Sequence, residues 1–333
     1  MLEMFGILYK FILIAVLCNA VIGQPVNAKI ITFDPPGSVE TLPYQINTKG
    51  EITGYYDDSN ELGHAFLRTL KGSITTFDVS KAKCGTFGFG INDHGVIVGQ
   101  YNDRLCNAHG FVRAADGTIT TFDAPGAVQT DAYAINNAGV IAGSYVDTKK
   151  YTHGYVRDAA GTFSTFDPPN SIETITYSIN NPGAIAGTYI DGADTYHGFV
   201  RGTDGKITNF DAPDSDGTFA YSINDSGSIV GYYQEREEAY GFVRSPNGIV
   251  TAIDPYKSNS VVVFGINKRG VVAGNYVSDM AHGFTYTSNG TYKTFDPKKS
   301  IDTNPTAIND KRGTTGWYQK ENPGPIHGFL RTR

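Results

Sequence analysis

The sequence contains few of the residues and motifs on which many enzyme and nucleic-acid-binding classes depend. Its 333 residues include three cysteines and one tryptophan, and no run of lysine or arginine stands out at a net charge of −6. A nucleic-acid partner therefore has no electrostatic support. Gly-x-Ser-x-Gly, His-Glu-x-x-His, a dinucleotide fingerprint and a phosphate-binding loop are also absent. The usual sequence evidence for a serine hydrolase, a zinc protease or a nucleotide site is thus missing.

The N-terminal segment differs from the rest of the chain. An apolar run over residues 11–22 follows Lys10 and precedes the small-x-small sequence Val26-Asn27-Ala28. This pattern is typical of a secretory signal peptide, so we expect residues 1–28 to be removed. The run is short for a membrane anchor, and no membrane span is expected. Residues 29–333 would then form a secreted, periplasmic or cell-surface protein.

What the chain has in abundance is repetition. An Ile-Asn step recurs at spacings of 45, 44, 44, 44, 43 and 42 residues. A fixed period in this range indicates a repeat architecture and overrides the two-domain expectation from length alone. The repeated asparagines are Asn47, Asn92, Asn136, Asn180, Asn224, Asn267 and Asn309.

Each repeat divides into four short segments that are rich in β-branched and aromatic residues. Segment A ends in Ile-Asn, segment B reads Gly-x-Ile-x-Gly-x-Tyr, segment C reads His-Gly-Phe-Val-Arg, and segment D reads Ile-Thr-Thr-Phe-Asp. Asn-x-x-Gly between A and B, and Asp-Gly or a similar pair between C and D, favour tight hairpins. The B–C and D–A connections are longer and lie on the opposite face, which we call the long-loop face.

Four antiparallel strands in each of seven repeats predict a single all-β domain, a seven-bladed β-propeller over residues 29–333. The mature chain begins with an isolated D segment and ends on a C segment. We therefore expect the N-terminal strand to complete the last blade and close the ring. In segment A, an aromatic, a small residue and Ile alternate, which predicts bulky faces stacked on small-residue faces of neighbouring blades. An open β-solenoid is the alternative, although no capping units are visible.

One repeat also carries the residues of a known family. His64-Ala65-Phe66-Leu67, with the Ile-Asn-x-x-Gly-x-Ile-x-Gly pattern, resembles the HAF-repeat family of extracellular proteins. Most other copies read His-Gly-Phe or His-Gly-Tyr, so this chain resembles a variant form. The resemblance covers residues 29–333 and implies an exported, repeat-built protein. It provides no catalytic residues.

The two cysteines that remain after cleavage, Cys84 and Cys106, lie in the D–A link and the following B–C link of one blade. Both links are on the long-loop face, so a disulfide between them is expected in an exported chain. It would close a loop of about 22 residues, which stabilises the fold by around 3 kcal/mol in the chain-entropy model.

Repeated polar residues have two interpretations. A ring of histidines could bind a metal or act as bases. We favour a structural role, in which each histidine is hydrogen-bonded within its blade to the Asp that ends segment D, because Tyr240 replaces histidine in the fifth copy. The repeated asparagines are expected to bond nearby backbone. The histidines are His64, His109, His153, His197, His282 and His327.

Acidic B–C loops offer oxygen ligands suited to calcium, but none has the spacing of a known calcium loop. Solvated surface loops are the favoured interpretation, and no cofactor is expected. The loops are Asp57-Asp58-Ser59-Asn60-Glu61, Asp191-Gly192-Ala193-Asp194 and Glu235-Arg236-Glu237-Glu238.

The repeats diverge most on the long-loop face, where function on a repeat scaffold usually resides. We expect a monomeric binding or scaffold module that holds a protein or carbohydrate on this face or at the channel mouth. The alternative is an extracellular hydrolase or lyase that acts on a polysaccharide-type substrate at the channel mouth. No catalytic residues are assigned. The candidate ligand-contacting residues are Arg104, Lys149, Tyr151, Tyr196, Glu235, Arg236, Tyr240 and Tyr256.

Overall fold

The structure is a computed structural model in which residues 28–255, 258 and 260–332 are described. Within them the chain forms 28 β-strands and no α-helix, which confirms the all-β prediction. In the same residues, no helix is long and apolar enough to cross a membrane. The predicted signal peptide lies, apart from Ala28, outside the described residues.

The strands are short and follow one another at regular intervals. They are β1 (Lys29–Phe33), β2 (Glu40–Ile46), β3 (Ile52–Asp57), β4 (Gly63–Arg68), β5 (Ile74–Phe77), β6 (Thr86–Ile91), β7 (Ile97–Asn102), β8 (Ala108–Arg113), β9 (Ile119–Phe122), β10 (Ala127–Ile135), β11 (Ile141–Asp147), β12 (Thr152–Arg157), β13 (Phe163–Phe166), β14 (Ser171–Ile179), β15 (Ile185–Asp191), β16 (Tyr196–Arg201), β17 (Ile207–Phe210), β18 (Gly217–Ile223), β19 (Ile229–Glu235), β20 (Glu238–Arg244), β21 (Val250–Ile253), β22 (Ser260–Ile266), β23 (Val272–Val277), β24 (Ala281–Tyr286), β25 (Tyr292–Phe295), β26 (Asp302–Ile308), β27 (Thr314–Gln319) and β28 (Ile326–Thr332).

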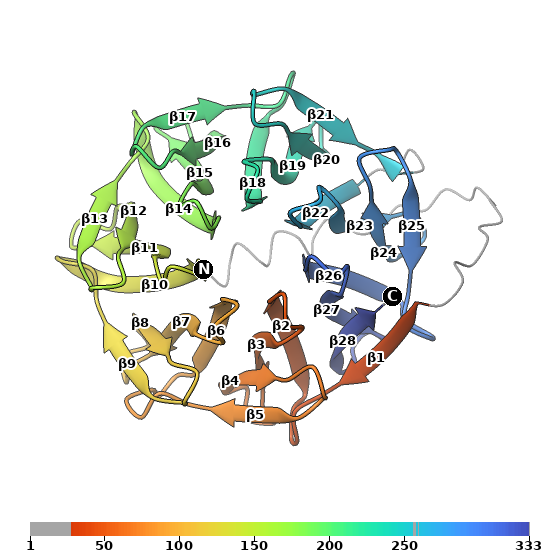
Figure 1. Ribbon diagram of the computed structural model, residues 1–333, viewed down its shortest axis with the longest axis horizontal. Coiled ribbons are helices and arrows are strands. Elements are labelled where there is room, and N and C mark those ends of the chain that lie inside the picture. The colour runs from red at the N-terminus through yellow and green to blue at the C-terminus, as the bar shows by residue number, and fades with distance from the viewer. Residues whose placement is uncertain (1–27, 256–257, 259, 333) are drawn as a thin grey trace.

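Consecutive strands pair antiparallel in groups of four, as β2 to β5 do. In the group that contains β26, β27 and β28, the fourth strand is β1, which pairs with β28 from Lys29↔Thr332 to Phe33↔Gly328. The two ends of the described chain thus share one sheet. Figure 1 shows the groups arranged in a ring, with the first strand of each group innermost and the fourth on the perimeter.

Six of the A–B hairpins turn at the repeated asparagine and the glycine three residues later, and Arg312 takes the place of that glycine after Asn309. In one of them the Gly139 N–H donates to the Asn136 carbonyl at 3.0 Å, and Gly139 has a φ of 80°. A positive φ of this kind costs a glycine little. All these turns lie at the same end of the strands, which we call the hairpin face, opposite the long-loop face.

A β-bulge interrupts every first strand at the same place. In β10 the register shifts between Ala132 and Ala134, so Tyr133 is the extra residue. The equivalent aromatics contact one another around the axis: the ring centroids of Tyr44 and Phe89 are 5.1 Å apart, and those of Phe89 and Tyr133 are 5.6 Å apart. The sequence predicted that these aromatics pack on the small-residue faces of neighbouring blades. They instead contact one another in a series around the axis. The bulge turns them because two residues oppose one across the pair.

Arginine–aromatic contacts recur between neighbouring groups. The Arg68 guanidinium lies over the Phe33 ring at 4.8 Å, and the contact recurs in most copies. In the sixth copy both partners change together: Tyr286 stands at the arginine position and Ile253 at the phenylalanine position, and the two belong to one apolar cluster. The paired change preserves packing where the cation–π contact is lost.

Cys84 and Cys106 form a disulfide with a Cα–Cα distance of 5.4 Å, as predicted. The sequence separation is 22 residues. The bond joins the D–A link before β6 to the connection between β7 and β8, and so ties two segments of the long-loop face in one group.

Candidate binding site at the centre of the hairpin face

The repeated asparagines link neighbouring groups as well as their own turns. Asn136 Oδ1 accepts the N–H groups of Ala138 and Val140, each at 3.0 Å, as predicted for a turn residue. Its Nδ2 reaches across and donates to the carbonyl oxygen of Asn180 at 3.3 Å. Every repeated asparagine makes the same donation to the next one, at 2.9 to 3.3 Å.

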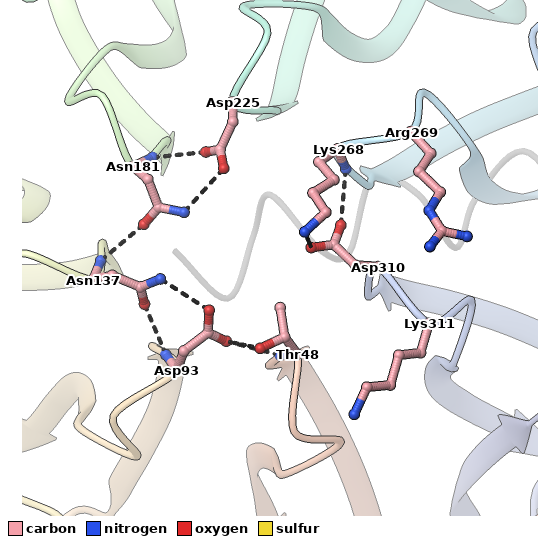
Figure 2. Close-up of a pocket in the computed structure, with 9 residues that line it drawn as sticks. All are labelled: Thr48, Asp93, Asn137, Asn181, Asp225, Lys268, Arg269, Asp310 and Lys311. Atoms are coloured by element: carbon pink, nitrogen blue, oxygen red, sulfur yellow. Dashed lines mark hydrogen bonds and ion pairs between the residues drawn. The ribbon is translucent and has the colours of Figure 1, made fainter.

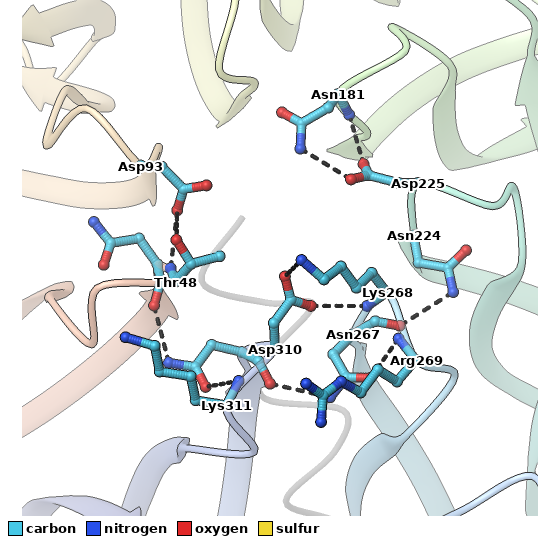
Figure 3. Close-up of polar contacts among 12 residues, drawn as sticks. Thr48, Asp93, Asn181, Asn224, Asp225, Asn267, Lys268, Arg269, Asp310 and Lys311 are labelled. Atoms are coloured by element: carbon cyan, nitrogen blue, oxygen red, sulfur yellow. Dashed lines mark hydrogen bonds and ion pairs between the residues drawn. The ribbon is translucent and has the colours of Figure 1, made fainter.

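The series returns to its start. Asn309 Nδ2 donates to the carbonyl oxygen of Asn47 at 2.9 Å, across 262 positions of sequence. Figure 3 shows the sector in which Asn224, Asn267 and the last copy are joined. We call this cycle the asparagine ring. Its side chains are buried, so each bond is protected from competition with water.

The residue after each ring asparagine lies nearer to solvent. Hydrogen bonds also link these residues from one copy to the next, but this second series is interrupted. The Asn137 N–H donates to Asn181 Oδ1 at 3.0 Å, and the Asn181 N–H donates to Asp225 Oδ1 at 2.9 Å. Lysine occupies this position in the sixth copy and cannot accept. Lys268 still donates its own N–H to Asp310 Oδ1, and its ammonium group forms an ion pair with Asp310 Oδ2, both at 3.0 Å.

These residues surround a pocket of about 430 Å³ at the centre of the hairpin face. Figure 2 shows their side chains around its rim. We call it the central pocket. It is lined by Thr48, Asp93, Asn137, Asn181, Asp225, Lys268, Arg269, Asp310 and Lys311.

The carboxylates of the central pocket are already well supplied with donors. Asp93 accepts from the Thr48 N–H and hydroxyl and from Asn137 Nδ2, at 2.6 to 2.9 Å. Partial burial raises the pKa of Asp93, but the hydrogen bonds from Thr48 and Asn137 outweigh it and leave this pKa below its ordinary value. A general acid at neutral pH needs the opposite shift.

The structure places the predicted ligand-contacting residues elsewhere. Arg104, Lys149, Tyr151 and Arg236 are exposed on long-loop connections, and Glu235 is half-buried there. None of these lines the central pocket. The turn carboxylates in two such loops, Asp147 and Asp191, accept backbone N–H groups of their own loops.

Of the remaining predicted aromatics, two pack against neighbouring rings and one lies outside the described residues. The ring of Tyr196 packs on Phe219 with centroids 4.7 Å apart. Tyr240 stacks on Tyr233 at 5.3 Å and donates to Glu238. Tyr256 is outside the described residues.

The repeated histidines take the structural role that the sequence predicts. His153 Nδ1 lies 2.7 Å from Asp167 Oδ2, and five other copies make the equivalent contact. Hydrogen bonding to Asp296 raises the pKa of His282 despite its partial burial. Among the described residues, no group of three or more His, Cys, Asp or Glu side chains is placed to hold a metal ion.

A buried carboxyl group in β10 departs from the repeat. Asp131 is 2% exposed, and its Oδ1 has no hydrogen-bond partner among the described residues. Burial raises its pKa to about 7, although a hydrogen bond with Tyr133 opposes the shift. In the other copies this position holds an apolar residue or, in the seventh, Asn304.

Replacing Asp131 with Asn should therefore stabilise the protein at alkaline pH. A carboxyl whose folded pKa lies above its unfolded value contributes its full stability only at pH values below the unfolded pKa, and loses it as pH rises. We expect Asp131→Asn to gain on the order of 2 kcal/mol at about pH 8 and little at about pH 4. Urea unfolding at both pH values measures this. An equal gain at both would contradict a buried, titrating carboxylate.

Comparison with known proteins identifies the fold. No family model and no curated protein matches the sequence. The structure is similar to virginiamycin B lyase from Staphylococcus aureus, with a TM-score of 0.58 and 13% identity over 92% of this chain and 100% of that one. It is also similar to the Dos1 propeller, with a TM-score of 0.54 and 10% identity over 92% of this chain and 94% of that one. The chain has a β-propeller fold, and these identities show the fold alone.

The sequence does carry a signal for the central pocket, and it lies in the short A–B turns. The asparagine of each A–B turn is constant, whereas the two residues after it vary in size and charge from copy to copy. Those two positions supply all the residues that line the pocket. The sequence prediction favoured the longer connections instead, because the turns are short and nearly uniform in length.

Proposed function

We propose that the chain is a seven-bladed β-propeller closed by its N-terminal strand. The pairing of β1 with β28 and the return of the asparagine ring from Asn309 to Asn47 support this proposal. The disulfide supports a location outside the reducing cytoplasm, in agreement with the exported, HAF-like protein that the sequence suggests.

We further propose that the protein is a binding module whose ligand, a carbohydrate, occupies the central pocket. The observation that carries this proposal is the departure from symmetry at the pocket rim. A residue that serves only the fold should recur in every copy, as the ring asparagine does. The next position instead holds Thr48, an aspartate, an asparagine or Lys268. Concave sites with a few convergent polar groups are the usual places for small ligands.

The chemistry of the rim suits hydroxyl groups. A carbohydrate hydroxyl both donates and accepts, so it matches a surface that offers hydrogen-bond donors and acceptors close together. The amide groups of Asn137 and Asn181 each keep one N–H for a ligand, and the flanking carboxylates of Asp93 and Asp225 keep lone pairs that can accept further hydrogen bonds. Their mutual hydrogen bonds hold these groups in place before a ligand arrives, which reduces the entropy lost on binding.

Binding to a glycan array, with one face blocked at a time, tests the location. Asn181→Trp fills the central pocket from an exposed turn position, and Ala193→Trp adds the same bulk to the long-loop face of the same repeat. We expect array signals to be lost with Asn181→Trp and kept with Ala193→Trp. The reverse pattern would move the site to the long-loop face. Cleavage of a bound glycan would replace the binding module with the lyase or hydrolase alternative.

A further inference from the structure

The cations of the central pocket gather in one sector. The third residue of the A–B turn is Arg269 in the sixth copy and Lys311 in the seventh, whereas the third to fifth copies have Ala138, Pro182 and Ser226 there. Figure 2 shows Arg269 and Lys311 on either side of Asp310. One side of the rim is therefore cationic, and the opposite side is built from amides and carboxylates.

Two of these cations have no counter-ion in the described part of the protein. Lys268 neutralises Asp310 through a 3.0 Å ion pair. Arg269 and Lys311 are exposed, and their side chains form no hydrogen bond or ion pair with any residue that the structure describes. A rim that pairs one lysine and leaves two neighbouring cations unpaired is suited to receive an anionic group.

The cationic surface continues outward from the axis. A second pocket, of about 350 Å³, shares Arg269 with the central pocket and adds Lys293 and Arg312, with no acidic residue in its lining. Its other lining residues are Val271, Thr287, Ser288, Asn289 and Thr291. The shared residue joins the two pockets into one surface. That surface suits an extended ligand with more than one anionic group.

We propose that the ligand is an acidic oligosaccharide, with a carboxylate held between Arg269 and Lys311 and hydroxyl groups against Asn137 and Asn181. This inference rests on the proposed carbohydrate-binding function. Arginine and carboxylate groups match in geometry and form strong charge-assisted hydrogen bonds. The carboxylates of Asp93 and Asp225, on the part of the rim outside the cationic sector, repel a second negative charge, so they fix the orientation of the ligand.

The test compares trigalacturonic acid with its neutral methyl ester, which keeps the sugar ring and removes the charge. Affinities are measured by titration calorimetry at about 50 mM salt, where electrostatic contributions are large. Wild-type protein is expected to bind the acid at least about tenfold more tightly than the ester, since tenfold corresponds to one charge-assisted contact.

The variant pair is matched in residue type. Arg269→Gln with Lys311→Gln removes the two pocket cations, and Arg104→Gln with Lys149→Gln removes an arginine and a lysine from the long-loop face. We expect the first pair to weaken binding of the acid about tenfold or more, and the second to leave it within about twofold. Both pairs are exposed, so unchanged melting temperatures should accompany both results.

Several results would overturn the inference. These are equal binding of acid and ester, no loss with the first variant pair, or no binding of trigalacturonic acid by the wild type. Competition by inorganic phosphate as strong as that by the sugar acid would also overturn it, because a simple anion site would then suffice. In each case Asn181→Trp and the glycan array still decide separately whether a carbohydrate binds in the central pocket.

Discussion

Replacement of Gly274 by alanine should destabilise the protein by roughly 4 kcal/mol, a severe effect for one added methyl group. A Cβ atom at Gly274 would lie 2.1 Å from the carbonyl oxygen of Val262 and 2.9 Å from the Cα atom of Val263. Both are backbone atoms of the paired strand β22, next to its bulge. They cannot move without breaking the strand pairing.

The same close approach occurs in every copy, which explains the second glycine of segment B. An added Cβ would meet a carbonyl oxygen of the first strand at 1.8 to 2.2 Å in each case. The bulge pushes the backbone of the first strand toward the second, and only a residue without a side chain fits opposite. These glycines are Gly54, Gly99, Gly143, Gly187, Gly231, Gly274 and Gly316.

Gly270→Ala in the adjacent turn is the control. Gly270 has a φ of 73°, and a Cβ there would meet no heavy atom within 4 Å. Its substitution should cost only the backbone term, about 1 kcal/mol. Chemical unfolding of both variants measures the difference. If Gly274→Ala lowered the free energy of unfolding no more than Gly270→Ala does, the close approach of the two strands at the bulge would be contradicted.

Replacement of Asn136 by aspartate should be as damaging, at about 4 kcal/mol near neutral pH, because it buries an unpaired charge. The carboxylate could still accept the turn N–H groups of Ala138 and Val140. It could not donate to the carbonyl oxygen of Asn180, so a buried negative charge would face an acceptor. The loss, measured by urea unfolding, should shrink as pH falls, because a protonated carboxyl can donate.

Alanine substitutions in the asparagine ring test the proposed closure. Asn136→Ala removes three hydrogen bonds and should cost about 3 kcal/mol. Asn309→Ala should cost the same, because Asn309 also donates across to Asn47. In an open solenoid, Asn309 would have no next copy, and its substitution would cost less. For the Asn136→Asp variant, the control is Ala138→Asp, which adds the same charge at an exposed position of the same turn. It should change the free energy of unfolding by less than about 0.5 kcal/mol.

Much of the fold could be predicted because each repeat encodes its strands locally. Asn-x-x-Gly fixes a turn, alternating residues fix a strand, and two cysteines on one face of one repeat allow a disulfide. The pairing of the repeated histidine with the Asp that ends segment D was also predicted, since both lie on adjacent strands of one group. These features depend on residues at most a few tens of positions apart.

The sequence allows a site at the channel mouth but does not predict the residues of the central pocket, because the pocket forms only when the turns of different repeats meet at the axis. Arg269 and Lys311 belong to different repeats. Neither has an acidic or aromatic neighbour in a recognised motif that would identify it as a binding residue from the sequence. Divergent sequence, longer loops and nearby tyrosines favour the long-loop face in a reading of the sequence. The turns diverge too, but only at the two positions after a constant asparagine.

The period, the four strands of each repeat, their hairpins and the pairing of Cys84 with Cys106 follow from the order of the amino acids. Three features appear only in the folded chain: the aromatics of the first strands contact one another around the axis, the asparagines bond from one repeat to the next, and unpaired cations gather on one side of the central pocket. Each repeat specifies its own turns and strand pairs through residues that are close in sequence, whereas equivalent residues of different repeats come together only at the axis.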